Sequence, residues 1–126
     1  MLLRHPAQRG QHGLGQQGAQ HGERFVAPAT RFQEKFARAG HAHAGVLLIL
    51  ALVCQVYADV ADLGGFLGWL ARTGVAIAAL WMPGGFFLAS MGAGRTEPNR
   101  FFVLIPAGAV VLAGGLASLG VGLLIA

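Results

Sequence analysis

Three long apolar runs constrain this chain more than any other feature. They cover about residues 41–60, 70–91 and 101–126, and no Lys, Arg, Asp or Glu occurs in 73–91 or 101–126. Each run is close to or above the roughly 20 residues that a helix needs to cross the ~30 Å hydrocarbon core of a bilayer. Backbone groups inside that core must bond to one another, so each run is predicted to be a helix. The sequence therefore predicts an all-α bundle of three transmembrane helices.

The composition excludes two other classes of protein. Only 11% of the 126 residues are charged, whereas soluble domains carry roughly 25%, which argues against a water-soluble α/β enzyme. Cys54 is the one cysteine, so a disulfide-stapled secreted domain is excluded as well. The chain also lacks the motifs of hydrolases, zinc proteases and nucleotide-binding folds, and we assign no catalytic residue.

Basic residues predict the orientation in the membrane. With three spans, the N-terminal segment and the 92–100 loop share one side, which then holds eight of the nine Lys and Arg residues. Arg72 is the one basic residue expected on the other side. By the positive-inside rule, the N-terminus is cytoplasmic and the C-terminus lies outside a bacterial-type inner membrane. Arg95 and Arg100 in the inner loop are expected to bind lipid phosphates.

Two segments precede the first span. Residues 1–23 are rich in Gln, Gly and His, a composition that predicts a disordered arm. Residues 24–40 predict a short amphipathic helix in the headgroup region, with Thr30 and Gln33 as a capping box and Gly40 as its stop. An alternative is that this helix packs on the bundle or on a partner. Its apolar face consists of Phe25, Ala29, Phe32 and Phe36.

His41 and His43 stand at the inner end of the first span. Neutral histidine is a common ligand, which makes haem or copper binding a hypothesis. However, residues two apart on a helix point ~200° apart, so the pair cannot share one ion while this turn is helical. The simpler alternative places one ring inward and the other among the headgroups. We therefore assign no cofactor and keep haem or copper as the alternative.

The polar residues of the first span align on one stripe, which we expect to face the other helices. A proton or cation path along this stripe is one interpretation. The alternative is that Asp59 and Asp62 merely end the helix in the outer headgroups. Gln55 lies deeper and is expected to hydrogen-bond a neighbouring helix, while Arg72 is expected to pair with Asp62 or Asp59. The stripe comprises His41, Gly45, Leu48, Leu52, Gln55, Asp59 and Asp62.

The second span contains Pro83, Gly84 and Gly85 near its middle. Proline donates no amide hydrogen and its ring displaces a carbonyl, so an interruption is expected here. Broken helices form substrate sites in some transporters. No acidic residue lies beside this one, which favours a simple kink.

The third span carries two rows of small residues that predict close helix packing. The packing partner, another span or another subunit, is left open. One row is Gly114, Ser118 and Gly122, and the other is Ala109, Ala113 and Ala117.

Three blocks, at 38–45, 83–88 and 97–100, resemble those of a group of short bacterial multi-span membrane proteins of unknown function. The group has an Arg-x-Gly-His-x-His-x-Gly block at the start of a transmembrane helix, matched here by residues 38–45. Its members carry a further apolar helix ahead of that block, where this chain has its Gln-, Gly- and His-rich segment. A misplaced start is therefore one hypothesis for residues 1–23. The resemblance implies no activity.

These features together predict a small membrane protein that acts by helix association, as a homo-oligomer or as a subunit beside another membrane protein. The alternative is a small transporter, a proton path, or a haem- or metal-binding protein that uses His41, His43, Gln55 and Asp59. Nucleic-acid binding by the basic N-terminal arm is not expected, because the arm has no aromatic interleaving before Phe25 and no recognisable fold.

Overall fold

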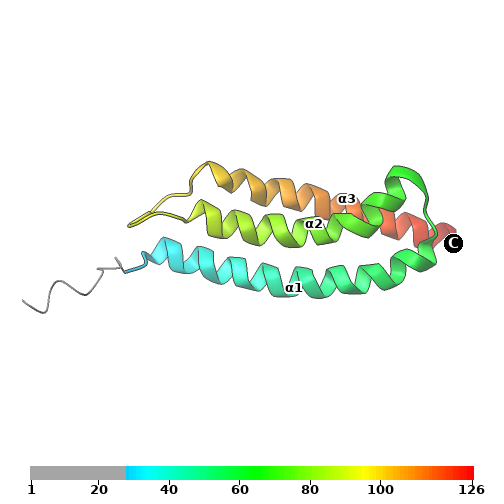
Figure 1. The fold of residues 1–126 in the computed structure, drawn as a ribbon, viewed down its shortest axis with the longest axis horizontal. Helices are drawn as coiled ribbons and strands as arrows, with labels where there is room; N and C mark the ends of the chain where they lie inside the picture. Colours follow the sequence, from blue (N-terminus) through cyan, green and yellow to red (C-terminus); the bar gives the residue numbers. More distant parts are fainter. Residues whose placement is uncertain (1–27) are drawn as a thin grey trace, which may run out of the picture.

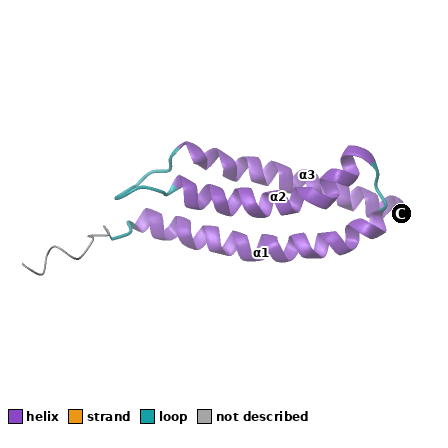
Figure 2. Cartoon of the chain, viewed as in Figure 1, coloured by secondary structure: helices purple, strands orange, loops and turns teal. Residues whose placement is uncertain are grey.

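The computed structural model describes residues 28–126 as an up-down-up bundle of helices (Figures 1 and 2). Helix α1 spans Arg31–Ala61, α2 spans Gly65–Ala89 and α3 spans Leu104–Ile125, with the short 3-10 helix η1 at Arg100–Val103 before α3. Helix α2 packs against both of the others, and α1 touches α3 least. The predicted arm at 1–23 lies outside the described residues.

The three helices are long and apolar enough to cross a membrane. Their surface has the pattern that lipid requires, because large aliphatic and aromatic side chains are exposed along all three while small residues fill the interior. The chain is a small integral membrane protein of three candidate spans. The all-α fold class predicted from the apolar runs is confirmed.

Helix α1 begins where the capping signals placed it but does not end at Gly40. Thr30 and Gln33 form the reciprocal capping box, and the helix then continues without a break to Ala61. The separate amphipathic helix ending at Gly40 is therefore wrong for the described residues, and Phe25 lies outside them. Gly40 is buried where α1 meets α2, and a Cβ there would lie 3.0 Å from the ring of Phe87. This glycine permits close approach instead of ending the helix.

The aromatic face at the start of α1 packs on the bundle. The ring of Phe36 lies 5.4 Å from that of Phe86 in α2 and 6.5 Å from that of Phe102 in η1, measured between centroids. Phe32 stacks on Phe36 at 4.2 Å. The contacts correspond to the alternative in which this segment packs on the bundle. Because the segment is part of α1, the helix is longer than a bilayer core is thick.

Helix α2 starts earlier than expected and is not interrupted. It begins at Gly65, so the connection between α1 and α2 contains only residues 62–64, with Asp62 in the left-handed region at φ 42°. Helix α2 continues through Pro83 to Ala89, so it has no transporter-like break there, and the simple kink that the sequence favoured requires none. Gly85 instead lets α3 approach, since a Cβ there would lie 2.8 Å from Cγ1 of Ile105.

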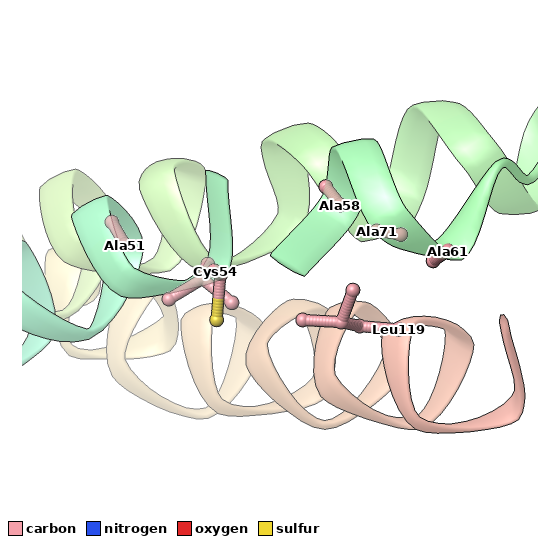
Figure 3. Close-up of a cluster of buried hydrophobic side chains, with 7 residues drawn as sticks. Ala51, Cys54, Ala58, Ala61, Ala71 and Leu119 are labelled. Carbon is pink, nitrogen blue, oxygen red and sulfur yellow. The ribbon is translucent and has the colours of Figure 1, made fainter. Parts of the chain in front are cut away.

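Buried residues, all of them small except Leu47, repeat every seven positions along the interior of all three helices. Such a heptad repeat keeps one face of a helix against its neighbours, and small side chains bring the backbones together. The closest approach joins Gly74 of α2 to Gly115 of α3, where a Cβ on Gly74 would lie 2.9 Å from the Cα of Gly115. Figure 3 shows the small side chains of α1 beside Leu119 of α3. The repeats are Gly40, Leu47, Cys54 and Ala61 in α1, Ala71, Ala78 and Gly85 in α2, and Gly108, Gly115 and Gly122 in α3.

Candidate functional site

The two histidines of α1 are held in the same way by their own helix. Nδ1 of His41 lies 2.8 Å from the carbonyl oxygen of Ala37, and Nδ1 of His43 lies 2.8 Å from that of Ala39. A carbonyl only accepts, so Nδ1 carries the proton in each neutral ring and donates it. Nε2 is then the nitrogen that can bind a metal or a proton, as in many ligating histidines whose second nitrogen is tied to the backbone.

The two rings do not converge on one point. His41 lies edge-on to Phe87, with 5.1 Å between centroids, and His43 lies against Phe86 at 5.0 Å. Because the turn is helical, the pair cannot share one ion within a single chain. Within residues 28–126, no group of three His, Cys, Asp or Glu side chains is close enough to hold a metal.

A polar cluster joins α1 to α2 near the end of the bundle where α1 ends and α2 begins. Nε2 of Gln55 donates to the backbone carbonyl of Arg72, so Gln55 bonds a neighbouring helix as expected. Nη1 of Arg72 donates to Oδ1 of Asp59 at 2.5 Å, which selects Asp59 as its partner in the described structure. The Asp59 side chain is still 75% exposed and that of Arg72 45% exposed. This cluster lies on the surface of the bundle.

The polar stripe of α1 faces outward, which corrects the expectation that it would face the other helices. Toward its N-terminal end the stripe touches Phe87 through His41, and toward its C-terminal end it touches Arg72 through Gln55. The stripe therefore runs beside α2, on the flank of the contact. Small residues one position earlier on the helix, such as Ala51 and Cys54, occupy the contact instead, because they let the backbones come closer. The exposed members are His41, Gly45, Leu48, Leu52, Gln55, Asp59 and Asp62.

The two small-residue rows of α3 face different surroundings. Ser118 and Gly122 are buried, and Gly114 lies against the side chain of Leu70 in α2. This row packs inside the chain, so the partner of these three residues is another span of the same protein. The second row, Ala109, Ala113 and Ala117, is exposed.

The loop after α2 is tied to the start of α1 by hydrogen bonds that the sequence did not predict. Nε2 of Gln33 donates to the carbonyl of Ser90 at 3.0 Å and to that of Gly92 at 2.6 Å, and Oγ1 of Thr30 donates to the carbonyl of Arg95. The capping-box spacing was the available signal, but it does not reveal that the same side chains reach the loop. Arg95 and Arg100 remain exposed, where a lipid phosphate can reach them.

No protein-family model, curated protein or solved structure matches the chain at a significant level. Three features of the described residues bear on function: the exposed polar stripe, the two histidines bonded to their own helix, and the exposed alanine row.

Proposed function

We propose that this chain is a non-enzymatic component of a bacterial-type cytoplasmic membrane that acts by associating with another set of helices. The exposed polar stripe on α1 is the observation that carries the proposal. Polar side chains in a span usually face other protein or water, because exposure to hydrocarbon leaves their hydrogen-bonding groups unsatisfied. Gln55, the deeper polar side chain on this outward flank, supports a protein neighbour there. A bundle of three helices also has little interior of its own.

The proposed orientation has the N-terminus in the cytoplasm and the C-terminus outside. The exposed basic residues support it, because Arg31, Lys35 and Arg38 in the first turns of α1 lie at the same end as Arg95 and Arg100. This end would meet the anionic headgroups of the inner leaflet. Arg72, the one basic residue at the opposite end of the described bundle, stands beside Asp59.

Crosslinking in native membranes tests association directly. The full-length chain, carrying a small epitope at its N-terminus, is treated before solubilisation with amine-reactive crosslinkers of several lengths, which react at Lys35 and at the N-terminal amine. Association predicts a band at a multiple of the 13.1 kDa monomer or at a larger defined mass. A chain that stays at monomer mass over a full range of crosslinker concentrations contradicts the proposal. A span-only peptide of unrelated sequence, expressed to the same level, is the control for random encounter.

A second candidate is a metal- or haem-binding role for the histidines. The observation that favours it is the tether on each Nδ1, which orients the ring and leaves Nε2 as the ligating nitrogen. Two ligands from two copies, or one axial ligand for haem, would suit this geometry. Titration with haemin or Cu²⁺ tests it, with the His41→Ala and His43→Ala variants as controls. An unchanged absorption spectrum would remove the candidate.

A further inference from the structure

The exposed stripe of α1 has the spacing of a second packing seam. We call His41, Gly45, Leu48, Leu52, Gln55 and Asp59 the polar ridge. Its steps alternate between four and three residues, the 3-4 repeat by which helices pack side by side over several turns. The inner seam of α1, displaced by one residue, already packs within the chain. Helix α1 thus has one occupied seam and one open seam beside it.

From these observations we infer that the polar ridge is a homodimer interface, in which two copies of this chain pack α1 against α1 around a two-fold axis along the membrane normal. The inference rests on the proposed association and names its partner and its surface. All copies insert in the same direction, so equal residues of two copies lie at equal depth. A two-fold axis along the membrane normal preserves that match.

Charge complementarity at the outer end identifies the occupant as a second copy. Asp59 and Arg72 lie side by side and therefore at one depth, and both remain partly exposed. A two-fold axis beside them brings the Arg72 of one copy to the Asp59 of the other. Because most of the Asp59 side chain is exposed, its carboxylate can accept this second guanidinium while keeping its own. The surface is complementary to itself.

Gln55 lies one turn deeper and fixes the register. It is six residues before the end of α1 at Ala61, roughly 9 Å along the axis, which places its amide at the edge of the hydrocarbon. The amide uses one N–H on Arg72 and has an oxygen and a second N–H to offer. A single polar residue within an apolar seam specifies register and partner number in coiled coils. The equivalent Gln55 of a second copy supplies the matching donor and acceptor.

The middle of the ridge provides the apolar contact. Leu48 is 59% and Leu52 63% exposed, and a Cβ built on Gly45 meets no atom within 4 Å, so no other part of the chain covers this stretch of the helix. Leucines of the second copy can pack against it as knobs into holes. The alanine row of α3 needs no protein partner, since lipid chains cover alanine without leaving any polar group unsatisfied.

A matched pair of cysteine variants tests the surface. In a Cys54→Ala background, Leu52→Cys lies on the ridge and Val110→Cys lies on α3, and the native side chains are 63% and 73% exposed. The full-length protein in liposomes is treated with molecular iodine, a membrane-permeant oxidant that joins two neighbouring thiols as a disulfide and is itself reduced to iodide. The inference predicts a covalent dimer for Leu52→Cys and monomer for Val110→Cys. Dimer at Val110 alone overturns this interface and leaves association standing, whereas monomer at both positions overturns the dimer itself.

A charge exchange tests the contact between copies against the bond within one chain. Asp59→Arg gives a copy with two cations at this point, and Arg72→Asp gives a copy with two carboxylates. Each variant alone is expected to lose most dimer, measured by energy transfer between donor- and acceptor-labelled copies. A one-to-one mixture is expected to regain it, because each copy then meets its complement. A contact confined to one chain predicts no recovery on mixing, and that result overturns the inference.

Helix content by circular dichroism confirms that each charge variant is folded. Gln55→Leu in the wild-type background then measures the contribution of the register residue. Loss of one interhelical hydrogen bond is expected to weaken dimerisation about tenfold. An unchanged dimer fraction for Gln55→Leu, together with no crosslink at Leu52→Cys, would overturn the assigned face.

Discussion

Replacing Gly115 by alanine tests the close approach that holds α3 against α2. The new methyl group would lie 3.1 Å from the Cα of Gly74, 3.2 Å from the carbonyl oxygen of Leu70 and 3.2 Å from the amide nitrogen of Val75. All three atoms belong to the backbone and cannot rotate away, so the two helices must separate by several tenths of an ångström. Overpacking of this kind costs about 1–3 kcal/mol.

Alanine is the better helix former, so part of that cost is offset by up to ~1 kcal/mol. The expected net effect of Gly115→Ala is a destabilisation of about 0–2 kcal/mol relative to the unaltered chain and about 1–3 kcal/mol relative to an alanine substitution without overpacking. Gly120→Ala is the matched control, because the same helix carries it, it is exposed and no atom lies within 4 Å of its Cβ position. The control should be neutral or stabilised by up to ~1 kcal/mol.

The assay is unfolding in detergent micelles, followed by loss of helical circular dichroism as the mole fraction of sodium dodecyl sulfate rises. The contrast between the two variants decides the question, because both make the same chemical change in one helix. If Gly115→Ala is as stable as Gly120→Ala, the backbone contact between Gly74 and Gly115 does not hold the bundle together.

Three further perturbations have defined outcomes. Thr30→Val removes the hydroxyl that caps α1 and bonds the inner loop, and should lower unfolding stability in micelles by about 1 kcal/mol, whereas an unaltered unfolding curve would contradict the cap. Gln33→Leu removes the hydrogen bonds to the carbonyls of Ser90 and Gly92, which frees the loop, so trypsin should cleave after Arg95 about ten times faster. The control Gln55→Leu makes the same change at the other end of α1 and should leave the cleavage rate unaltered. Asp59→Asn should change the stability of the detergent monomer by less than about 1 kcal/mol, since the Asp59–Arg72 pair is partly exposed. A larger loss in the same unfolding assay would show that this ion pair stabilises the monomer more than an exposed pair can.

Much of the fold could be predicted from the sequence because lipid imposes strict requirements on length and charge. The three apolar runs had to be helices, and the capping box located the start of α1. Gly40 was misleading because glycine both ends helices and allows them to touch, and local sequence does not distinguish the two roles. The phenylalanines that decide between them, Phe86 and Phe87, are more than forty residues away.

The orientation of the polar stripe could not be predicted for a related reason. Periodicity identifies which residues share a face of α1, but apolar character does not separate the inside from the outside of a bundle in lipid. The spacing of mostly small residues was the usable signal, since a repeat with a period of seven residues, through Gly40, Leu47, Cys54 and Ala61, marks the buried seam. Gln55 was predicted to bond a neighbouring helix and does so, from the flank of the contact.

Counting subunits in a bilayer tests the central claim most directly. The full-length chain with one fluorophore at its N-terminus is reconstituted into liposomes at less than one chain per vesicle on average, after equilibration at a higher density. Stepwise photobleaching of single spots then reports the number of chains. Association through the polar ridge predicts mostly two-step traces, falling to one step for Asp59→Arg and returning to two when Asp59→Arg and Arg72→Asp are mixed. One-step traces for the unaltered protein would contradict it.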